Sequence, residues 1–216
     1  ETFIKRLVLE SSAVSVNGRG ITDISLSINN FSTKGSTGSG ILLTFNDDYG
    51  SPYRLEGSAR LGVNPSLDLS LSAPSLSFMA LRQYKLPLDP QKGKWKLLLK
   101  AQMHGDEFKL NGNAAFDKLT MLLKGEDIPL TGGLEFAAAY DAREDTATLE
   151  SCTLQVDGLI RLKARGRMER VRKERAFTAE VSHDGMEVNR LFALLPQKLR
   201  RDLKPGGTVL PGSIRI

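Results

Sequence analysis

Leu67-Asp68-Leu69-Ser70-Leu71-Ser72 is a strict alternation of leucine with a short polar residue. Successive side chains of a β-strand point to opposite faces of the sheet, so this stretch predicts a strand with one apolar and one polar face. The pattern recurs at residues 24–28, 95–103, 134–140, 152–156 and 177–181. Half-buried antiparallel strands alternate in this way, whereas parallel strands buried on both faces are almost continuously apolar. We therefore expect an all-β fold of antiparallel sheets, either curled over an apolar groove or packed as a sandwich.

Two stretches break the alternation and favour one or two short helices. Pro196 suits the first turn of a helix that Gly206-Gly207 would end. Three leucines would then share one face of this helix: Leu195, Leu199 and Leu203. A second short helix is expected around residues 78–83.

Asn-Gly and Asp-Gly pairs separate several of the alternating stretches. They lie at residues 17–18, 111–112, 157–158 and 184–185, and such pairs favour tight hairpin turns. Asn111-Gly112 lies between Leu110 and Ala114, where a bulge or the close approach of a neighbouring strand fits equally well.

A short motif recurs at a long spacing. Leu55-Glu56-Gly57-Ser58-Ala59 is echoed 55 residues later by Leu110-Asn111-Gly112-Asn113-Ala114, and more faintly by residues 162–166. We interpret residues 1–216 as a single β-rich segment built from weak repeats of about 55 residues. The alternative is that β-rich sequences align loosely with themselves. Because the chain begins at Glu1 without an apolar signal stretch, we expect it to be a piece of a larger protein.

Composition excludes several classes of protein. Hydrophobic residues make up 40% and charged residues 25%, which is typical of a globular domain, and the longest apolar runs (136–140 and 191–195) are too short to span a bilayer. Aromatic residues are only 6%, which disfavours sugar-binding modules and the stacking platforms that bind single-stranded nucleic acid. No nucleic-acid partner is expected. The net charge of +5 is compatible with an anionic partner, and equally with a role in solubility alone.

No pattern of reactive residues predicts an enzyme. His104, His183 and the single Cys152 have no metal-ligand spacing, and no Gly-x-Ser-x-Gly elbow would present a nucleophile. The acidic pairs at 47–48 and 106–107 are adjacent in sequence rather than facing each other. We expect no catalysis, no cofactor and no metal.

Four cations alternate with apolar residues between positions 160 and 167. On a strand they share one face: Arg161, Lys163, Arg165 and Arg167. This stripe is a candidate contact for an anionic surface, and the alternative is a solvated outer face.

Eight side chains are predicted to face one apolar interior, whether groove or closed core. They are Leu67, Leu69, Leu71, Leu97, Leu99, Leu119, Met121 and Leu123. A register slip of one residue would expose the whole set, so the register should be strongly specified.

Two parts of the sequence carry a resemblance to a known family. The first part begins with a strand pair, followed by the Leu-x-Gly-x-Ala strand at residues 55–59. The next strand has the sequence Asn64-Pro65-Ser66-Leu67-Asp68-Leu69-Ser70-Leu71, and a turn of small residues then connects it to residues 76–81. In the second, residues 186–196, 203–207 and 210–214 fit a short helix followed by a strand that begins after glycine. With these degenerate motifs, most of the chain resembles the AsmA-like family of bacterial envelope proteins.

The resemblance implies long β-sheets folded over an apolar groove, a periplasmic location and a parent protein anchored in the inner membrane. It also implies a role in moving phospholipid or in assembling the outer membrane, without catalytic residues. The family's N-terminal anchor has no counterpart in this chain.

Two hypotheses follow. In the first, the apolar face contacts phospholipid or another acyl-chain lipid and neighbouring segments of the parent protein. In the second, the chain is a purely structural β-sandwich or stalk that mediates protein–protein interaction. An aliphatic lining suits both acyl chains and a closed core, because burial of apolar surface is non-directional.

Overall fold

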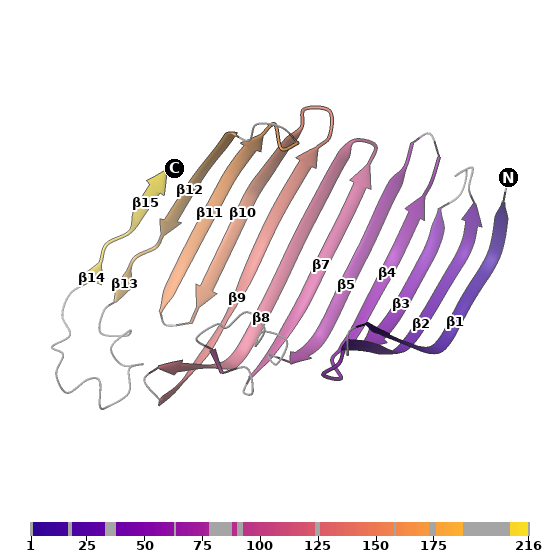
Figure 1. Cartoon of the computed structure of the whole chain (residues 1–216). Coiled ribbons are helices and arrows are strands. Elements are labelled where there is room, and N and C mark those ends of the chain that lie inside the picture. Colours follow the sequence, from indigo (N-terminus) through magenta and orange to yellow (C-terminus); the bar gives the residue numbers. More distant parts are fainter. Residues whose placement is uncertain are drawn as a thin grey trace.

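The fold comes from a computed structural model that describes residues 2–16, 19–32, 38–62, 64–77, 88–89, 93–123, 126–157, 159–172, 176–187 and 208–215. Twelve strands lie side by side in chain order, and each pairs antiparallel with the next (Figure 1). They are β1 (Phe3–Val16), β2 (Arg19–Ser32), β3 (Ser39–Asn46), β4 (Pro52–Arg60), β5 (Ser66–Ser77), β7 (Lys94–His104), β8 (Glu107–Leu123), β9 (Glu126–Asp141), β10 (Thr146–Val156), β11 (Ile160–Glu169), β12 (Ala176–His183) and β15 (Gly212–Arg215).

Three short strands complete the description. β6 (Leu88–Asp89) pairs with the far end of β8, and β13 (Met186–Glu187) pairs with β14 (Thr208–Val209) as a separate two-stranded sheet. The large sheet begins at β1, ends at β15 and is not closed into a barrel. The predicted all-β antiparallel fold is confirmed. The helices predicted at residues 78–83 and 196–203 lie outside the described residues, and the described residues contain no helix.

The sheet is open rather than sandwiched. Apart from the β13–β14 pair, no second sheet is present among the described residues. The solvent-accessible surface is 14374 Å², whereas a compact protein of 23.7 kDa exposes roughly 9,800 Å². In the described part of the chain only four apolar side chains are buried: Ala73, Leu76, Leu119 and Ile128.

Irregularities in pairing bend several strands near one rim of the sheet. Register shifts interrupt the β1–β2, β2–β3, β5–β7 and β8–β9 ladders close to the end where β5 and β8 finish. Ser11, Asp23 and Lys118 adopt positive φ at three of these places, and an extra residue of this kind bends a strand. Figure 1 shows the lower ends of β8 and β9 turning away from the plane of the sheet.

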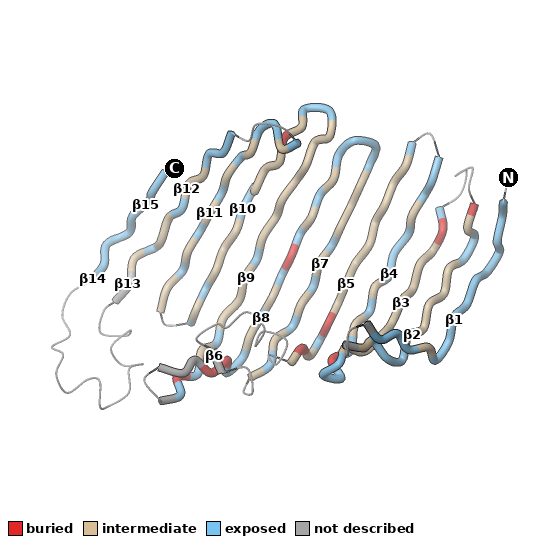
Figure 2. Tube along the Cα trace, in the orientation of Figure 1, coloured by how far each residue is buried: buried red, intermediate tan, exposed pale blue. Residues whose placement is uncertain are grey.

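The four buried apolar side chains lie close to this bend. Ala73 and Leu76 lie at the lower end of β5, and Leu119 and Ile128 lie at the lower ends of β8 and β9, where Figure 2 shows most of the buried positions. Ala73 shares its face of β5 with Leu69 and Leu71, so this part of the burial lies on the face that carries the leucines of β5. The fold is a curled, one-layered sheet.

Candidate functional site

One face of the sheet is apolar from its first strand to its last. Directly paired residues share a face, so the register defines rows that run across the strands. One such row contains an apolar residue or glycine on each of the twelve strands, and we call it the apolar row: Leu9, Leu26, Leu43, Leu55, Leu71, Leu99, Gly112, Phe136, Cys152, Ala164, Val181 and Ile214. The face that carries this row is called the apolar face below.

A second row has the same character, and it lies two residues along each strand, or three on β10, where the register shifts. It contains Leu7, Ile28, Ile41, Gly57, Leu69, Ala101, Leu110, Ala138, Leu149, Gly166 and Ala179. With neighbouring strands about 4.8 Å apart, the apolar face extends for roughly 50 Å across the twelve strands. Along β7, the alternating positions from Trp95 to Met103 span roughly 26 Å at 3.3 Å per residue.

The eight residues predicted to face one apolar interior are placed as follows. Leu67, Leu69 and Leu71 on β5 pair with Met103, Ala101 and Leu99 on β7, and Leu97 pairs with Ala73. These five predicted leucines are half-buried on the apolar face, while Leu119 is buried at the lower rim. The backbones of Met121 and Leu123 belong to the end of β8, and their side chains lie outside the described set.

Two phenylalanine rings lie against glycines in the middle of this face. Gly112 pairs with Phe136, and a Cβ built on Gly112 would overlap the Phe136 ring. In the second pair the ring lies on β8 and the glycine on β9: Phe116 pairs with Gly132, and a Cβ built on Gly132 would lie 2.8 Å from Cζ of Phe116. Asn111-Gly112 is therefore a close approach inside β8, one of the alternatives left open by the sequence. The two rings fill the places that side chains at the glycines would occupy.

Polar side chains on the apolar face are confined largely to its borders. Tyr53 stacks on Phe45 with ring centroids 4.8 Å apart, and its hydroxyl donates a hydrogen bond to Oδ2 of Asp47 over 3.2 Å. Partial burial, followed by the nearby charge of Asp47, raises the pKa of Tyr53 to about 12. His183, at the lower end of β12, accepts a hydrogen bond on Nδ1 from the backbone N–H of Gly185. Cys152 is half-buried in the apolar row.

The cation stripe of β11 lies on the opposite, polar face, and each cation has an acidic partner. Lys163 Nζ is 2.7 Å from Asp184, Arg165 Nη2 is 2.6 Å from Glu180, and Arg167 Nε is 3.3 Å from Glu169. Arg161 is 4.0 Å from Asp184. The side-chain hydrogen bonds from Arg165 and Lys163 lower the pKa values of Glu180 and Asp184, respectively. This pairing reduces the positive charge that the stripe presents to a partner.

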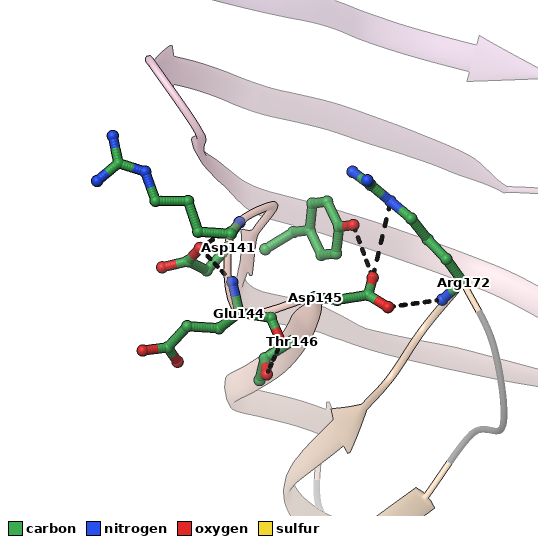
Figure 3. Close-up of polar contacts among 7 residues, drawn as sticks. Asp141, Glu144, Asp145, Thr146 and Arg172 are labelled. Atoms are coloured by element: carbon green, nitrogen blue, oxygen red, sulfur yellow. Dashed lines mark hydrogen bonds and ion pairs between the residues drawn. The ribbon is translucent and has the colours of Figure 1, made fainter.

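A polar cluster ties two turns together at the upper rim (Figure 3). Asp145 lies in the β9–β10 turn and accepts hydrogen bonds from Tyr140 Oη (3.0 Å) and from the backbone N–H of Arg172 (3.1 Å). The Arg172 guanidinium lies 5.7 Å from the centre of the Tyr140 ring. Each polar group in the cluster has a structural partner, so the cluster fixes the β11–β12 turn beside the β9–β10 turn.

A hollow of about 700 Å³ lies on the polar face near Gly133. Its charged lining consists of Lys94, Lys96, Asp117, Glu135, Asp157 and Arg161. The three carboxylates accept hydrogen bonds from Thr131, Asn113 and Gln155 over 3.0–3.2 Å. The hollow is open to solvent and balanced in charge, so it fits a gap between long polar side chains better than a binding pocket.

The strands described contain no cluster of three or more histidine, cysteine or acidic side chains that could hold a metal ion. Among the described residues, no helix has the length and apolar character needed to span a membrane.

Sequence reasoning identified the alternation at residues 24–28 of β2 but missed the contribution of β1 and β3 to the apolar face. Leu9, Leu26 and Leu43 continue the apolar row, but Leu7-Val8-Leu9 is a continuous apolar run in which the alternation is hidden. The alternation of Arg6, Val8 and Glu10 with Leu7 and Leu9 in the sequence was the available signal.

No family model, curated protein or solved structure matches this chain.

Proposed function

We propose that this chain is a non-enzymatic, lipid-contacting segment of an AsmA-like envelope protein, and that its apolar face carries acyl chains of phospholipid in the periplasm. Transport of phospholipid or assembly of the outer membrane would be the role of the parent protein, anchored in the inner membrane. The observation that carries the proposal is the apolar row, which is unbroken across twelve strands and lacks a covering layer among the described residues.

The dimensions of the apolar face support an acyl chain as its ligand. One leaflet of a bilayer contributes roughly 15 Å of hydrocarbon, half of the usual 30 Å core. An acyl chain of that length fits within the roughly 26 Å of alternating apolar side chains along β7. The roughly 50 Å width accommodates several chains side by side, and contact with leucine, valine and alanine needs no directional bond.

The polar face supports a weaker contact with head groups. Arg161, Lys163, Arg165 and Arg167 remain the proposed contact with an anionic lipid surface, although carboxylates already neutralise much of their charge. Surface attraction of this kind is screened within about 10 Å at 0.1 M salt. Charge reversal of the four residues should therefore reduce binding to anionic vesicles only at low salt.

Two leucines on one strand provide a matched test of the lipid contact. Leu99 points to the apolar face, whereas the neighbouring Leu98 is 50% exposed on the polar face. The purified chain would be incubated with vesicles of phosphatidylethanolamine and phosphatidylglycerol, and bound lipid measured by native mass spectrometry. Because burying a leucine against an apolar ligand contributes about 1.5–3 kcal/mol, Leu99→Asp should weaken lipid binding about tenfold or more. Leu98→Asp should leave binding unchanged.

A reporter on Cys152 separates loss of binding from loss of folding. Cys152 is the only cysteine and belongs to the apolar row, so an environment-sensitive fluorophore attached there should respond to acyl chains. Circular dichroism would confirm that both leucine variants retain strand structure. Equal lipid binding by the Leu98→Asp and Leu99→Asp variants, or no bound lipid at all, would refute the proposal and favour a structural stalk.

A further inference from the structure

The inner strands of the sheet carry a large apolar surface without a second layer of described strands above it. On β3 to β12 this surface consists of the apolar row, the second row and a third row toward the upper rim. The upper row contains Ser39, Ala59, Leu67, Met103, Phe108, Tyr140, Ala147, Met168 and Phe177. With strands about 4.8 Å apart and rows about 6.6 Å apart, the three rows cover roughly 900 Å². Contiguous apolar patches on monomeric soluble proteins rarely exceed a few hundred Å².

Large and small side chains are distributed unevenly over this surface. In the apolar row, β3, β4, β5 and β7 carry leucine, whereas β10, β11 and β12 carry smaller residues. The smaller residues are Cys152, Ala164 and Val181. The upper row has the reverse order, because Ser39 and Ala59 lie on β3 and β4, while Met168 and Phe177 lie on β11 and β12. Each half of the surface is therefore large where the other half is small.

A two-fold axis parallel to the strands would bring these two halves together. Two copies placed face to face about such an axis have opposite strand orders, so β3 to β7 of one copy lie over β9 to β12 of the other. With the axis over β8, large residues meet small ones in both rows. The facing pairs near the axis are Leu71 with Cys152, Leu55 with Ala164, and Ala59 with Met168.

Other positions of the axis would bring large residues together. An axis over β7 would place Leu55 on Phe136, and an axis over β9 would place Leu67 on Phe177. An axis across the strands, at the level of the apolar row, would stack each strand on its own equivalent, with leucine on leucine and alanine on alanine. Overpacking and cavities both destabilise an interface, so the shape of the surface favours the axis over β8.

We propose that the apolar face is the interface of a homodimer, in which a second copy of this chain packs face to face with Leu71 of each copy over Cys152 of the other. The dimer is a two-layered sandwich with one layer from each copy. It buries roughly 1,800 Å² in total, which is within the usual size of a specific protein–protein interface. The inference goes beyond the proposed function and does not rest on lipid binding. Because lipid would occupy the same face, the second copy and lipid should compete.

The native cysteine allows a direct test of the pairing by cross-linking. In the Leu71→Cys variant, a bismaleimide of about 10 Å span should link position 71 of one copy to Cys152 of the other, since packed sheets lie about 10 Å apart. The wild-type chain should not be linked, because its two copies of Cys152 would lie four strands apart, roughly 20 Å. Ser70→Cys is the matched control and should not be linked, because Ser70 lies on the polar face of the same strand.

The second experiment exchanges the sizes of the facing side chains, with the oligomeric state read by sedimentation velocity over a range of protein concentrations. Leu71→Ala leaves a cavity in the interface and Cys152→Leu overpacks it, so each should raise the dimer dissociation constant at least about tenfold. The double variant restores the volume at both facing pairs and should regain most of the wild-type dimerisation. Leu98→Ala, on the polar face, is the control and should have no effect. Circular dichroism would confirm that each variant retains strand structure.

Three results would overturn the proposal. They are a wild-type chain that stays monomeric at every concentration, a wild-type chain that is cross-linked through Cys152 alone, and a double variant that does not recover. The second of these would place the axis across the strands. Lipid binding by a chain that never dimerises would leave the proposed function intact while removing this inference. A dimer that persists in excess phospholipid without bound lipid would support this inference and refute the proposed function.

Discussion

Among single residues, Gly132 is a position where added volume should be poorly tolerated. A Cβ there would overlap the carbonyl oxygen of Gln155 and lie 2.8 Å from Cζ of Phe116, so both backbone and ring oppose it. Gly132→Ala should lower the free energy of unfolding by about 1–3 kcal/mol through overpacking. Gly40→Ala is the matched control, since nothing lies within 4 Å of its added Cβ. Urea denaturation of both variants checks this, and equal stabilities would contradict the packing described for Phe116.

Tyr53 gives a second prediction at this scale, for alkaline pH. Its folded pKa of about 12 exceeds the model-compound value of 10.0, so the folded state holds the phenol proton more tightly than the unfolded state does. The part of the free energy of unfolding that depends on this proton has its full value below pH 10 and is lost as the pH rises toward 12. Tyr53→Phe should remove that part of the alkaline destabilisation, measured from denaturation midpoints across this range. The same pH dependence in both proteins would contradict the described environment of the hydroxyl.

At the scale of elements, ion pairs join β11 to β12 and to the turn that follows. The pKa values of Glu180 and Asp184 in the folded state are lower than their unfolded values of 4.5 and 3.8. The stability that the two charged carboxylates contribute is therefore complete above the unfolded pKa values, and it is lost as the pH falls through the folded pKa values. Glu180→Gln should therefore flatten the acid side of the stability profile. Glu150→Gln, a change at an exposed carboxylate on the neighbouring β10, should leave it unchanged. Thermal melting between neutral and acid pH checks both variants.

The alternation of side chains predicted most of the elements, because a period of two is a direct consequence of strand geometry. It identified the stretches that form β5, β7 and β12, together with the apolar side of each. The bends could not be predicted in this way. They arise at Ser11, Asp23 and Lys118, which adopt positive φ although they are not glycine. Of these only Asp23 is of a residue type that is enriched at positive φ, and aspartate is too common in strands and turns for it to mark a bend.

For the molecule as a whole, the sequence indicated an apolar face but not how far it continues. Which strand lies beside which is set by the meander order, and only the register shows that Leu9 and Ile214 belong to one row. The carboxylate partners of the cation stripe were equally hidden, since Glu180 and Asp184 lie on the next strand and turn. The predicted repeat places Leu55, Leu110 and Leu162 on β4, β8 and β11, three strands apart along the meander, so successive copies run in opposite directions.

This architecture makes a prediction about how the molecule opens. Each strand of the meander pairs only with its neighbours in chain order, as the units of a repeat array do. The stability of each strand should therefore depend on the strands beside it rather than on one core shared by the whole sheet. Amide hydrogen exchange should be slowest in β7, β8 and β9, and should become faster toward β1 and β15, because each of these two strands pairs with only one other described strand. Uniform protection across all twelve strands would instead require a cooperative core, which the open sheet does not provide.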